Sequence, residues 1–265
     1  MKLSVITVCK NVSSNIEKTL LSIIKQTYKN IEIIVIDGNS NDDTLSYLKK
    51  YKKNINHLLI ESDSGIYNAM NKGLKLATGD VIYFLNAGDK FFDEHVVDKV
   101  IKKFKKSSKT NIIYGNVKTI DALSNKLSNQ IYGKINKTYF FYTCFVQQAM
   151  FFKKKCFEVT GHFDESFKIS GDYDWIVRSI TKHNFKMEYL NEFFCIFAMG
   201  GVSNSGKYKE LHEKENNRIK KHFTKFDKFF IRKLKIKPFH FFEESTEISE
   251  KIHRKIIYKL IGWGL

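Results

Sequence analysis

Short apolar runs alternate with amphipathic segments in the N-terminal part of the chain, and this alternation constrains the fold most strongly. The apolar runs cover residues 3–9, 31–37 and 81–86, with a weaker run at 55–61. Uninterrupted β-branched runs of this length are typical of strands that are buried on both faces of a parallel sheet. The segments between them carry apolar residues at helical spacing: Ile16, Leu20, Ile23 and Ile24, then Leu45, Leu48 and Tyr51, then Ile66, Met70, Leu74 and Ala77. We therefore expect right-handed βαβ units and an α/β fold with a mostly parallel sheet flanked by helices.

Polar residues follow each of these predicted strands. They are the stretches "CKN", "DGNSND", "ESDSG" and "NAGD", the last being Asn86 to Asp89. In an open α/β sheet, ligands bind beyond the carboxyl ends of the strands, so these four stretches are expected to meet at one edge. "NAGD" by itself would also serve as an ordinary turn. The convergence of all four favours a binding site, with the small Ala87 and Gly88 allowing close approach.

Two common phosphate-binding motifs are absent from the sequence. No GxGxxG follows the first predicted strand, and no GxxxxGK[ST] is present, which excludes the dinucleotide fingerprint and the P-loop. A metal-assisted sugar-nucleotide site stays open. A hard divalent cation needs only one or two protein carboxylates when substrate phosphates supply further oxygens, and Asp89 is the candidate anchor.

The chain is strongly basic, with 45 Lys and Arg against 28 Asp and Glu and a net charge of +17. Such a charge suits nucleic acid, an anionic membrane surface or a phosphorylated substrate, although lysines scattered among acids also fit a solvated surface. After Lys207 the sequence becomes basic with interleaved phenylalanines, and its end places Ile252, Ile256, Leu260 and Trp263 on one helical stripe. Such a helix either lies on an anionic membrane or packs on the rest of the protein.

The four cysteines, Cys9, Cys144, Cys156 and Cys195, are widely separated and form no CxxC pair. They are expected to be free thiols in a reducing compartment. The N-terminal apolar run is too short for a signal peptide, and no run reaches the length of a membrane-spanning helix. We expect a cytoplasmic protein, with peripheral attachment to the inner membrane as the further alternative.

Five stretches together resemble one known family. "SVITVCKN", "IVIDGNSNDDT", "SDSGIYNAMNKGLKLATGDVIYFLNAGD", "QQAMFF" and "GHFDESFKISGDYDW" are similar to segments of family 2 glycosyltransferases with the GT-A fold. The likeness is greatest to bacterial enzymes that assemble capsule, exopolysaccharide or lipopolysaccharide sugars. It covers roughly residues 3 to 205, which implies a GT-A domain at 1–205 and a basic, amphipathic helical extension at 206–265.

The resemblance also implies roles for particular residues. Asp172 would be the general base, and Asp89 would bind Mn²⁺ or Mg²⁺. Asn86 and Gly88 stand where carboxylates are common, which leaves Asp89 as the sole acidic group there. From the residues alone, Asp172 and Asp174 also suit a helix amino terminus. The remaining positions form two groups: nucleotide contacts at Val8, Cys9, Asn11, Asp37, Asp63 and Asn86, and donor-sugar or acceptor contacts at Gln147, Gln148, Asp174 and Trp175.

The expected activity is therefore an inverting, metal-assisted transfer of a hexosyl or N-acetylhexosaminyl group. The donor would be a nucleotide sugar, most simply a UDP-sugar, and the acceptor a glycan or a polyprenyl-linked or lipid-linked sugar of a bacterial surface polysaccharide. Residues 207–265 would offer contact with an anionic membrane. A sugar-phosphate nucleotidyltransferase is the alternative, but "CKNVSSN" lacks the glycine-rich loop such enzymes carry. The second alternative is a nucleic-acid-binding protein. The sequence has no RNP, helix-turn-helix or zinc pattern, so no nucleic acid partner is expected.

Overall fold

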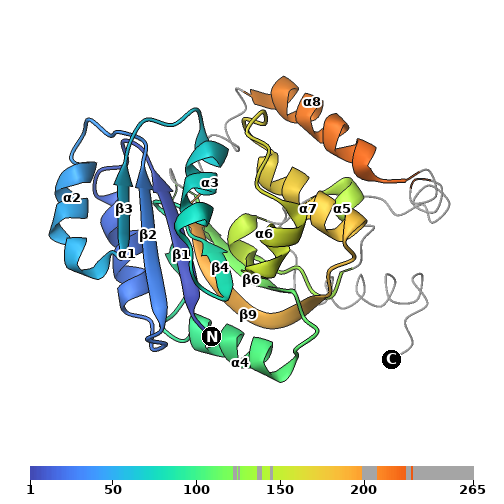
Figure 1. Cartoon of the computed structure of the whole chain (residues 1–265), viewed down its shortest axis with the longest axis horizontal. Coiled ribbons are helices and arrows are strands. Elements are labelled where there is room, and N and C mark those ends of the chain that lie inside the picture. The colour runs from blue at the N-terminus through green and yellow to red at the C-terminus, as the bar shows by residue number, and fades with distance from the viewer. Residues whose placement is uncertain are drawn as a thin grey trace.

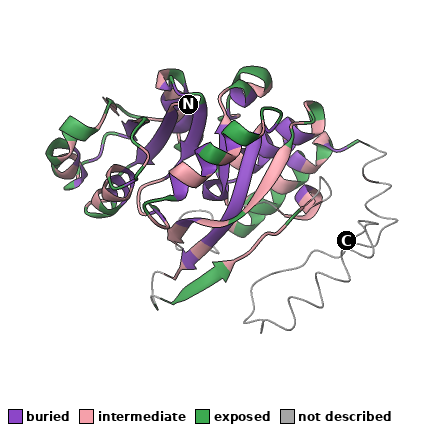
Figure 2. Ribbon diagram, turned by 90° about the horizontal axis from the view of Figure 1, so that it is seen from below, coloured by how far each residue is buried: buried purple, intermediate pink, exposed green. Residues whose placement is uncertain are grey.

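The computed structural model describes residues 1–121, 124, 126–135, 139–143, 146–198, 208–224 and 228. Its centre is a nine-stranded sheet in the order β3-β2-β1-β4-β8-β6-β9-β5, with β7 paired to β6. The four strands expected from the apolar runs are β1 (Leu3–Cys9), β2 (Ile31–Asp37), β3 (His57–Ile60) and β4 (Val81–Phe84). They pair in parallel as one half of the sheet. The strands β1 and β4 are buried along their whole lengths, as Figure 2 shows for the centre of the sheet.

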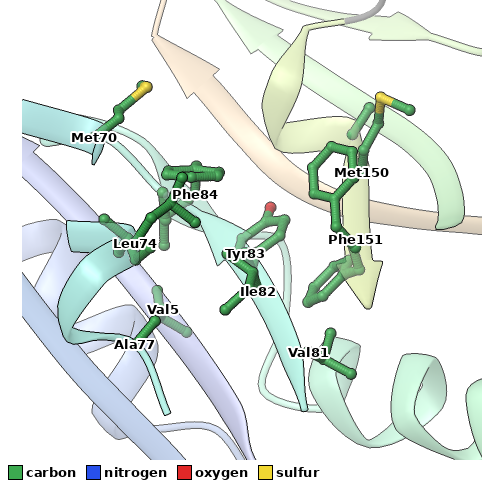
Figure 3. Close-up of a cluster of buried hydrophobic side chains, with 14 of the residues drawn as sticks. Val5, Met70, Leu74, Ala77, Val81, Ile82, Tyr83, Phe84, Met150 and Phe151 are labelled. Carbon is green, nitrogen blue, oxygen red and sulfur yellow. The ribbon is translucent and has the colours of Figure 1, made fainter. Parts of the chain in front are cut away.

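The expected helices connect these strands. They are α1 (Asn15–Ile24), α2 (Thr44–Lys50), followed by the short 3₁₀ turn η1 (Lys52–Asn54), and α3 (Ile66–Leu76). Met70, Leu74 and Ala77 lie on the side of α3 that faces Val5 and Phe84 of the sheet (Figure 3). A Cβ atom on Gly73 would lie 2.4 Å from Cγ2 of Ile6. Glycine at this position therefore lets α3 approach β1 closely.

The second half of the sheet is mixed in direction. It contains β5 (Lys90–Phe91), β6 (Ile112–Ile120), β7 (Leu127–Gln130), β8 (Met150–Lys153) and β9 (Met187–Ala198). β8 runs antiparallel to both β4 and β6, whereas β6 and β9 are parallel. The helices here are α4 (Val96–Lys106), α5 (Tyr139–Tyr142), the 3₁₀ turn η2 (Gln147–Ala149), α6 (Lys155–Thr160) and α7 (Gly171–Lys182).

Aromatic packing joins the two halves. The rings of Tyr83 on β4 and Phe151 on β8 are stacked with centroids 3.9 Å apart (Figure 3). The Tyr83 hydroxyl donates a hydrogen bond to the carbonyl of Gln148, 2.7 Å away. A buried tyrosine needs such a partner for its hydroxyl. The contact fixes η2, and with it Gln148, against the end of β4.

The last described elements are α8 (Lys209–Ile219) and the 3₁₀ turn η5 (Lys220–His222). α8 lies beside α7 (Figure 1), so the described part of the predicted extension packs on the domain. The apolar stripe predicted at 252–263 lies outside the described residues. Within the ranges that the structure describes, no helix has the length and hydrophobicity needed to cross a bilayer.

Candidate active site

The carboxyl ends of β1 and β2 are joined by hydrogen bonds between the loops that follow them. Asn11 donates its backbone N–H to the hydroxyl of Ser40 and accepts from the N–H of Asn41 through its side chain. Ser13 donates its N–H to Asp42 and to Thr44. Asn11 (φ 52°), Ser13 (φ 44°) and Asn39 (φ 63°) all have left-handed backbones. Such conformations cost free energy and persist where neighbouring contacts hold them, often at functional sites.

Asp37 and Cys9 end the two central strands side by side. The Asp37 carboxylate is buried and accepts hydrogen bonds from the N–H and the hydroxyl of Ser40 and from the Cys9 thiol. Burial, followed by the charge of Asp37, raises the pKa of the Cys9 thiol far above its usual range. Cys9 is therefore a neutral thiol and no nucleophile. Val8 precedes it as a buried strand residue.

Asp63 lies at the same edge of the sheet, beside Gly38. A Cβ on Gly38 would lie 2.4 Å from Oδ2 of Asp63 and 3.1 Å from Cδ of Lys10. Oδ1 of Asp63 accepts the N–H of Gly65, just before α3 begins. The sequence predicted nucleotide contacts at Asp37 and Asp63, and the structure brings these two residues to neighbouring positions with Lys10, a cation that the sequence analysis did not single out.

The Asn86–Asp89 stretch forms a turn at the same edge. The backbone N–H of Ala87 donates a hydrogen bond to the carbonyl of Val8, and the N–H of Asp89 donates to the carbonyl of Asn86. The Asp89 carboxylate is 4% exposed; Oδ2 accepts from Nε2 of Gln148 at 2.7 Å and Oδ1 from the N–H of Ala198 at 3.0 Å. Burial raises the pKa of Asp89 to about 7, although these two hydrogen bonds act in the opposite direction. Gln147, next to Gln148, is also buried.

Asn86 and Asp89 place amide and carboxylate oxygens, the ligand types that divalent cations prefer, on this turn. Oδ1 of Asn86 is buried and has no hydrogen-bond partner, and Asp89 has no ion pair in the described part of the chain. A buried carboxylate is normally paired with a cation or bound to a metal. No cluster of three or more His, Cys, Asp or Glu side chains that could hold a metal occurs among the described residues. Substrate oxygens would therefore have to complete the coordination sphere.

Asp172 lies in the first turn of α7 and is half-buried. Oδ1 of its carboxylate accepts a hydrogen bond from the Tyr67 hydroxyl at 3.1 Å. Burial raises the pKa of Asp172, and the N–H groups at the helix start and the Tyr67 hydroxyl offset that effect in part. A carboxylate with a raised pKa and some access to solvent suits proton abstraction. Lys168 donates to the carbonyl of Ser64, which connects the loop before α7 to the loop after β3.

The loop before α7 is held by α8. The Glu215 carboxylate is buried and accepts the backbone N–H groups of Lys168, Ile169 and Ser170. Arg218 donates to Asp164 and lies over the ring of Phe167, 4.2 Å from its centroid. α8 thus fixes the segment that leads directly into Asp172.

Asp174 and Trp175 take part in the packing of α7. Oδ2 of Asp174 accepts from Nε of Arg178 at 2.7 Å, and Oδ1 lies 2.9 Å from Nε2 of His222. The Trp175 ring is 0% exposed, stacks on Phe157 and donates to the carbonyl of Gly161. The sequence places both residues at a sugar, whereas in the structure both side chains are buried and bonded within the packing of α7.

The sequence analysis missed Tyr67 and Glu215. Tyr67 stands inside the stretch "SDSGIYNAMNKG" but was not assigned a role. Glu215 stands in a polar segment with no distinguishing pattern. Only the fold places these residues beside Asp172 and the loop before it.

Comparison with known proteins adds a family match. The model of the family described as glycosyl transferase family 2 matches residues 4–206. A PGL/p-HBAD biosynthesis glycosyltransferase of Mycobacterium bovis is 26% identical over 213 residues, which cover 78% of this chain and 81% of the relative. An uncharacterized glycosyltransferase of Mycobacterium tuberculosis is 29% identical over 177 residues, or 66% and 68% of the two chains.

Solved structures share the fold. S. aureus TarS 1-349 in complex with UDP-GlcNAc has a TM-score of 0.65 and 18% identity, covering 80% of this chain and 64% of the TarS chain. The mannosyltransferase PcManGT of Pyrobaculum calidifontis, in complex with GDP-Man and Mn²⁺, has a TM-score of 0.60 and 15% identity, covering 98% and 80%. This chain therefore spans less than two thirds of that TarS chain. The similarity confirms the predicted α/β architecture of the GT-A type.

Proposed function

The chain belongs to glycosyltransferase family 2, and on that premise we propose that it transfers a hexosyl or N-acetylhexosaminyl group from a nucleotide sugar with inversion of configuration. The donor we favour is a UDP-sugar, and the acceptor a glycan or a polyprenyl-linked or lipid-linked sugar in bacterial surface polysaccharide synthesis. The observation that carries the proposal is the position of Asp172. It is a half-buried carboxylate with a raised pKa, and its loop is connected to the β1–β2–β3 edge through Lys168 and Ser64.

The donor would bind at the edge where β1, β2 and β4 end. Val8, Cys9, Asn11, Asp37, Asp63 and Asn86 line this edge in the proposal. Hydrogen bonds join the Asn11 and Ser40 loops to one another. A preorganised loop loses little conformational entropy on binding, which favours affinity. Lys10, beside Gly38, is placed to interact with a phosphate oxygen.

Asp172 would take the proton of the acceptor hydroxyl as the new glycosidic bond forms. The same step breaks the bond between the anomeric carbon and the diphosphate oxygen, and the diphosphate leaves with the bonding electron pair. Asn86 and Asp89 are the residues that would hold Mn²⁺ or Mg²⁺, which supplies positive charge to the leaving diphosphate when bound. Gln148 holds the Asp89 carboxylate in place through its amide. In this proposal Gln147 and Gln148 lie beside the transferred sugar.

The proposal includes the predicted location as well. The protein would act at the cytoplasmic face of the inner membrane, with residues 207–265 in contact with anionic lipid. Support comes from the net charge of +17 and from the basic composition of this segment. Binding to vesicles with and without phosphatidylglycerol, at low and high salt, would test this part.

The first experiment is a panel of UDP- and GDP-sugars, scored by thermal shift and slow donor hydrolysis with and without Mn²⁺. A donor that binds the folded state raises the melting temperature. We expect one UDP-sugar to stabilise the wild type in the presence of Mn²⁺ and to lose this effect in Asp89→Ala. Asp172→Asn should keep the thermal shift but lose turnover by at least about a hundredfold, the lower end of the usual range for a general base. Asp98→Asn, an α4 surface substitution, is the control. No response to any sugar nucleotide would contradict the proposal.

A further inference from the structure

The hydroxyl of Tyr67 connects α3 to the first turn of α7. Its oxygen lies 2.5 Å from the carbonyl oxygen of Ile169 and 3.1 Å from Oδ1 of Asp172, so its one proton is shared between these two acceptors. Tyr67 is 4% exposed, and burial raises the pKa of its hydroxyl well above the usual value. Burial therefore favours the protonated hydroxyl, which donates a hydrogen bond.

The ring of Tyr67 has a fixed position. A Cβ on Gly171, the residue before Asp172, would lie 2.7 to 2.9 Å from three carbons of the ring. On another side the ring contacts Phe163, with centroids 5.9 Å apart. The absence of a side chain at Gly171 is thus what admits the ring, and packing on both sides leaves the hydroxyl little freedom to move.

One turn further along α3, Asn71 holds the start of the same segment. Its amide nitrogen donates to the carbonyl of Phe163, and its amide oxygen accepts the N–H of Phe163, both at 3.0 Å. Residues 163–172 are therefore held by α3 at both ends. Because α3 begins directly after the Asp63 loop, this helix links the predicted nucleotide edge to the predicted base.

We propose that Tyr67 is a positioning residue for Asp172: its hydroxyl holds Oδ1 of the carboxylate against α3 and leaves the other carboxylate oxygen to meet the acceptor hydroxyl. This inference rests on the proposed role of Asp172 as the base. The tyrosine itself touches neither substrate nor reacting atoms in this scheme.

The contact has a measurable electrostatic consequence. A hydrogen bond donated to a carboxylate stabilises the charged form, so Tyr67 lowers the pKa that burial raises. Among the described residues, His212 on α8 also acts on Asp172, and its charge shifts the pKa in the same direction. Tyr67→Phe should therefore move the titration midpoint of Asp172 upward, and the same change made in a His212→Gln background should give an upward shift as well.

The test is a carboxyl ¹³C NMR titration of full-length protein labelled at aspartate, with the Asp172 resonance identified by its loss in Asp172→Asn. Tyr51→Phe is the matched control, because the Tyr51 hydroxyl also donates to a carboxylate, that of Glu17, at 2.7 Å. We expect the upward shift in Tyr67→Phe, a shift of the same sign in Gly171→Ala, and none in Tyr51→Phe. An Asp172 midpoint that is unchanged or lower in Tyr67→Phe would overturn the inference.

Turnover distinguishes this inference from the proposed function. Hydrolysis of the UDP- and GDP-sugar panel is followed for the same variants as a function of pH. We expect Tyr67→Phe to lower kcat by about tenfold with KM unchanged, and to move the acidic limb of the pH profile upward. If Asp172→Asn keeps full activity, the proposed base is wrong whatever the NMR titration shows. If Asp172→Asn is inactive while Tyr67→Phe has the wild-type kcat and pH profile, only the positioning role is wrong.

Discussion

Glu215→Ala tests whether α8 is an essential part of the folded domain. The substitution removes the carboxylate that accepts three consecutive backbone N–H groups, at 2.7, 3.1 and 2.8 Å for Lys168, Ile169 and Ser170. The contacts to Ile169 and Ser170 are buried, whereas the one to Lys168 is partly exposed. Water can therefore replace the carboxylate at Lys168 but not at the other two.

The size of the effect follows from those two buried groups. A buried donor left without a partner costs about 1–3 kcal/mol, so the pair contributes roughly 2–6 kcal/mol to the free energy of unfolding. In a protein of this size each kcal/mol changes the melting temperature by about 2–4 °C. For a loss near the middle of that range, about 4 kcal/mol, we expect a decrease of roughly 8–16 °C. Glu215→Gln can place its one amide oxygen at the position of Oε2, which accepts both buried N–H groups, and should therefore lose much less stability than Glu215→Ala.

Thermal and urea unfolding followed by circular dichroism would measure the change. Glu213→Ala is the matched control, because Glu213 is an exposed residue of the same type on the same helix. Its effect should be within about 0.5 kcal/mol. If Glu215→Ala and Glu213→Ala unfold at the same temperature, the assumption that the three hydrogen bonds stabilise the domain is wrong.

Three further predictions concern the sheet and the thiols. Burial alone would raise the pKa of Glu32, but hydrogen bonds from Lys2, Ser4 and Thr78 lower it to about 2. The charged form is thus stabilised, and Glu32→Gln should cost roughly 2 kcal/mol in urea melts at pH 7 after allowance for solvent screening. The difference in unfolding free energy between wild type and Glu32→Gln should shrink as the pH falls from about 4.5. A difference that does not change with pH would contradict the lowered pKa of Glu32. Gly73→Ala should destabilise the protein by about 1–3 kcal/mol in the same assay, because the new methyl group meets Ile6 on β1; wild-type stability would show that α3 can move away. Burial raises the thiol pKa of Cys9, Cys156 and Cys195. Maleimide should therefore label these cysteines slowly in the native protein and fast in urea, as read by peptide mass spectrometry. Rapid labelling of the native protein would refute their burial.

The parallel half of the fold could be predicted from the sequence because its strands are apolar on both faces. The predicted runs 3–9 and 31–37 coincide with β1 and β2. The run at 81–86 extends past β4, which ends at Phe84, because Leu85 is buried outside the ladder and Asn86 already belongs to the turn. A continuous apolar pattern marks burial, and it does not mark the residue at which strand pairing stops.

The mixed half of the sheet was not predicted. β6 pairs with β9, so that Ile112 lies opposite Met187, and no short-range pattern specifies such a partner. The aromatic stretch at 139–152 contains α5, η2 and β8 in succession. Its aromatic residues follow neither a period of 2 nor one of 3.6, because the chain changes direction between them.

At the candidate site, local sequence predicted which strand ends carry polar groups but not what those groups contact. Asp63 lies beside Gly38, the residue after Asp37, because the neighbouring strands β2 and β3 end at the same edge. Trp175 was predicted at a sugar, yet its large apolar ring is buried against Phe157 and Phe152, the usual outcome for a tryptophan on an apolar helix face. Tyr67 bonds a residue 105 positions away, a distance over which sequence spacing carries no information.

The position of α8 has a consequence for how the protein is made. Glu215 follows the segment it holds by 45 residues or more, and the ribosome exposes the chain from its N-terminus. The parallel strands and their loops can therefore assemble while Asp172 still lacks the helix that fixes the backbone before it. Under the proposed function, a nascent chain that has not yet released α8 would carry the donor edge before the backbone ahead of Asp172 is fixed, so catalytic competence would follow the release of α8.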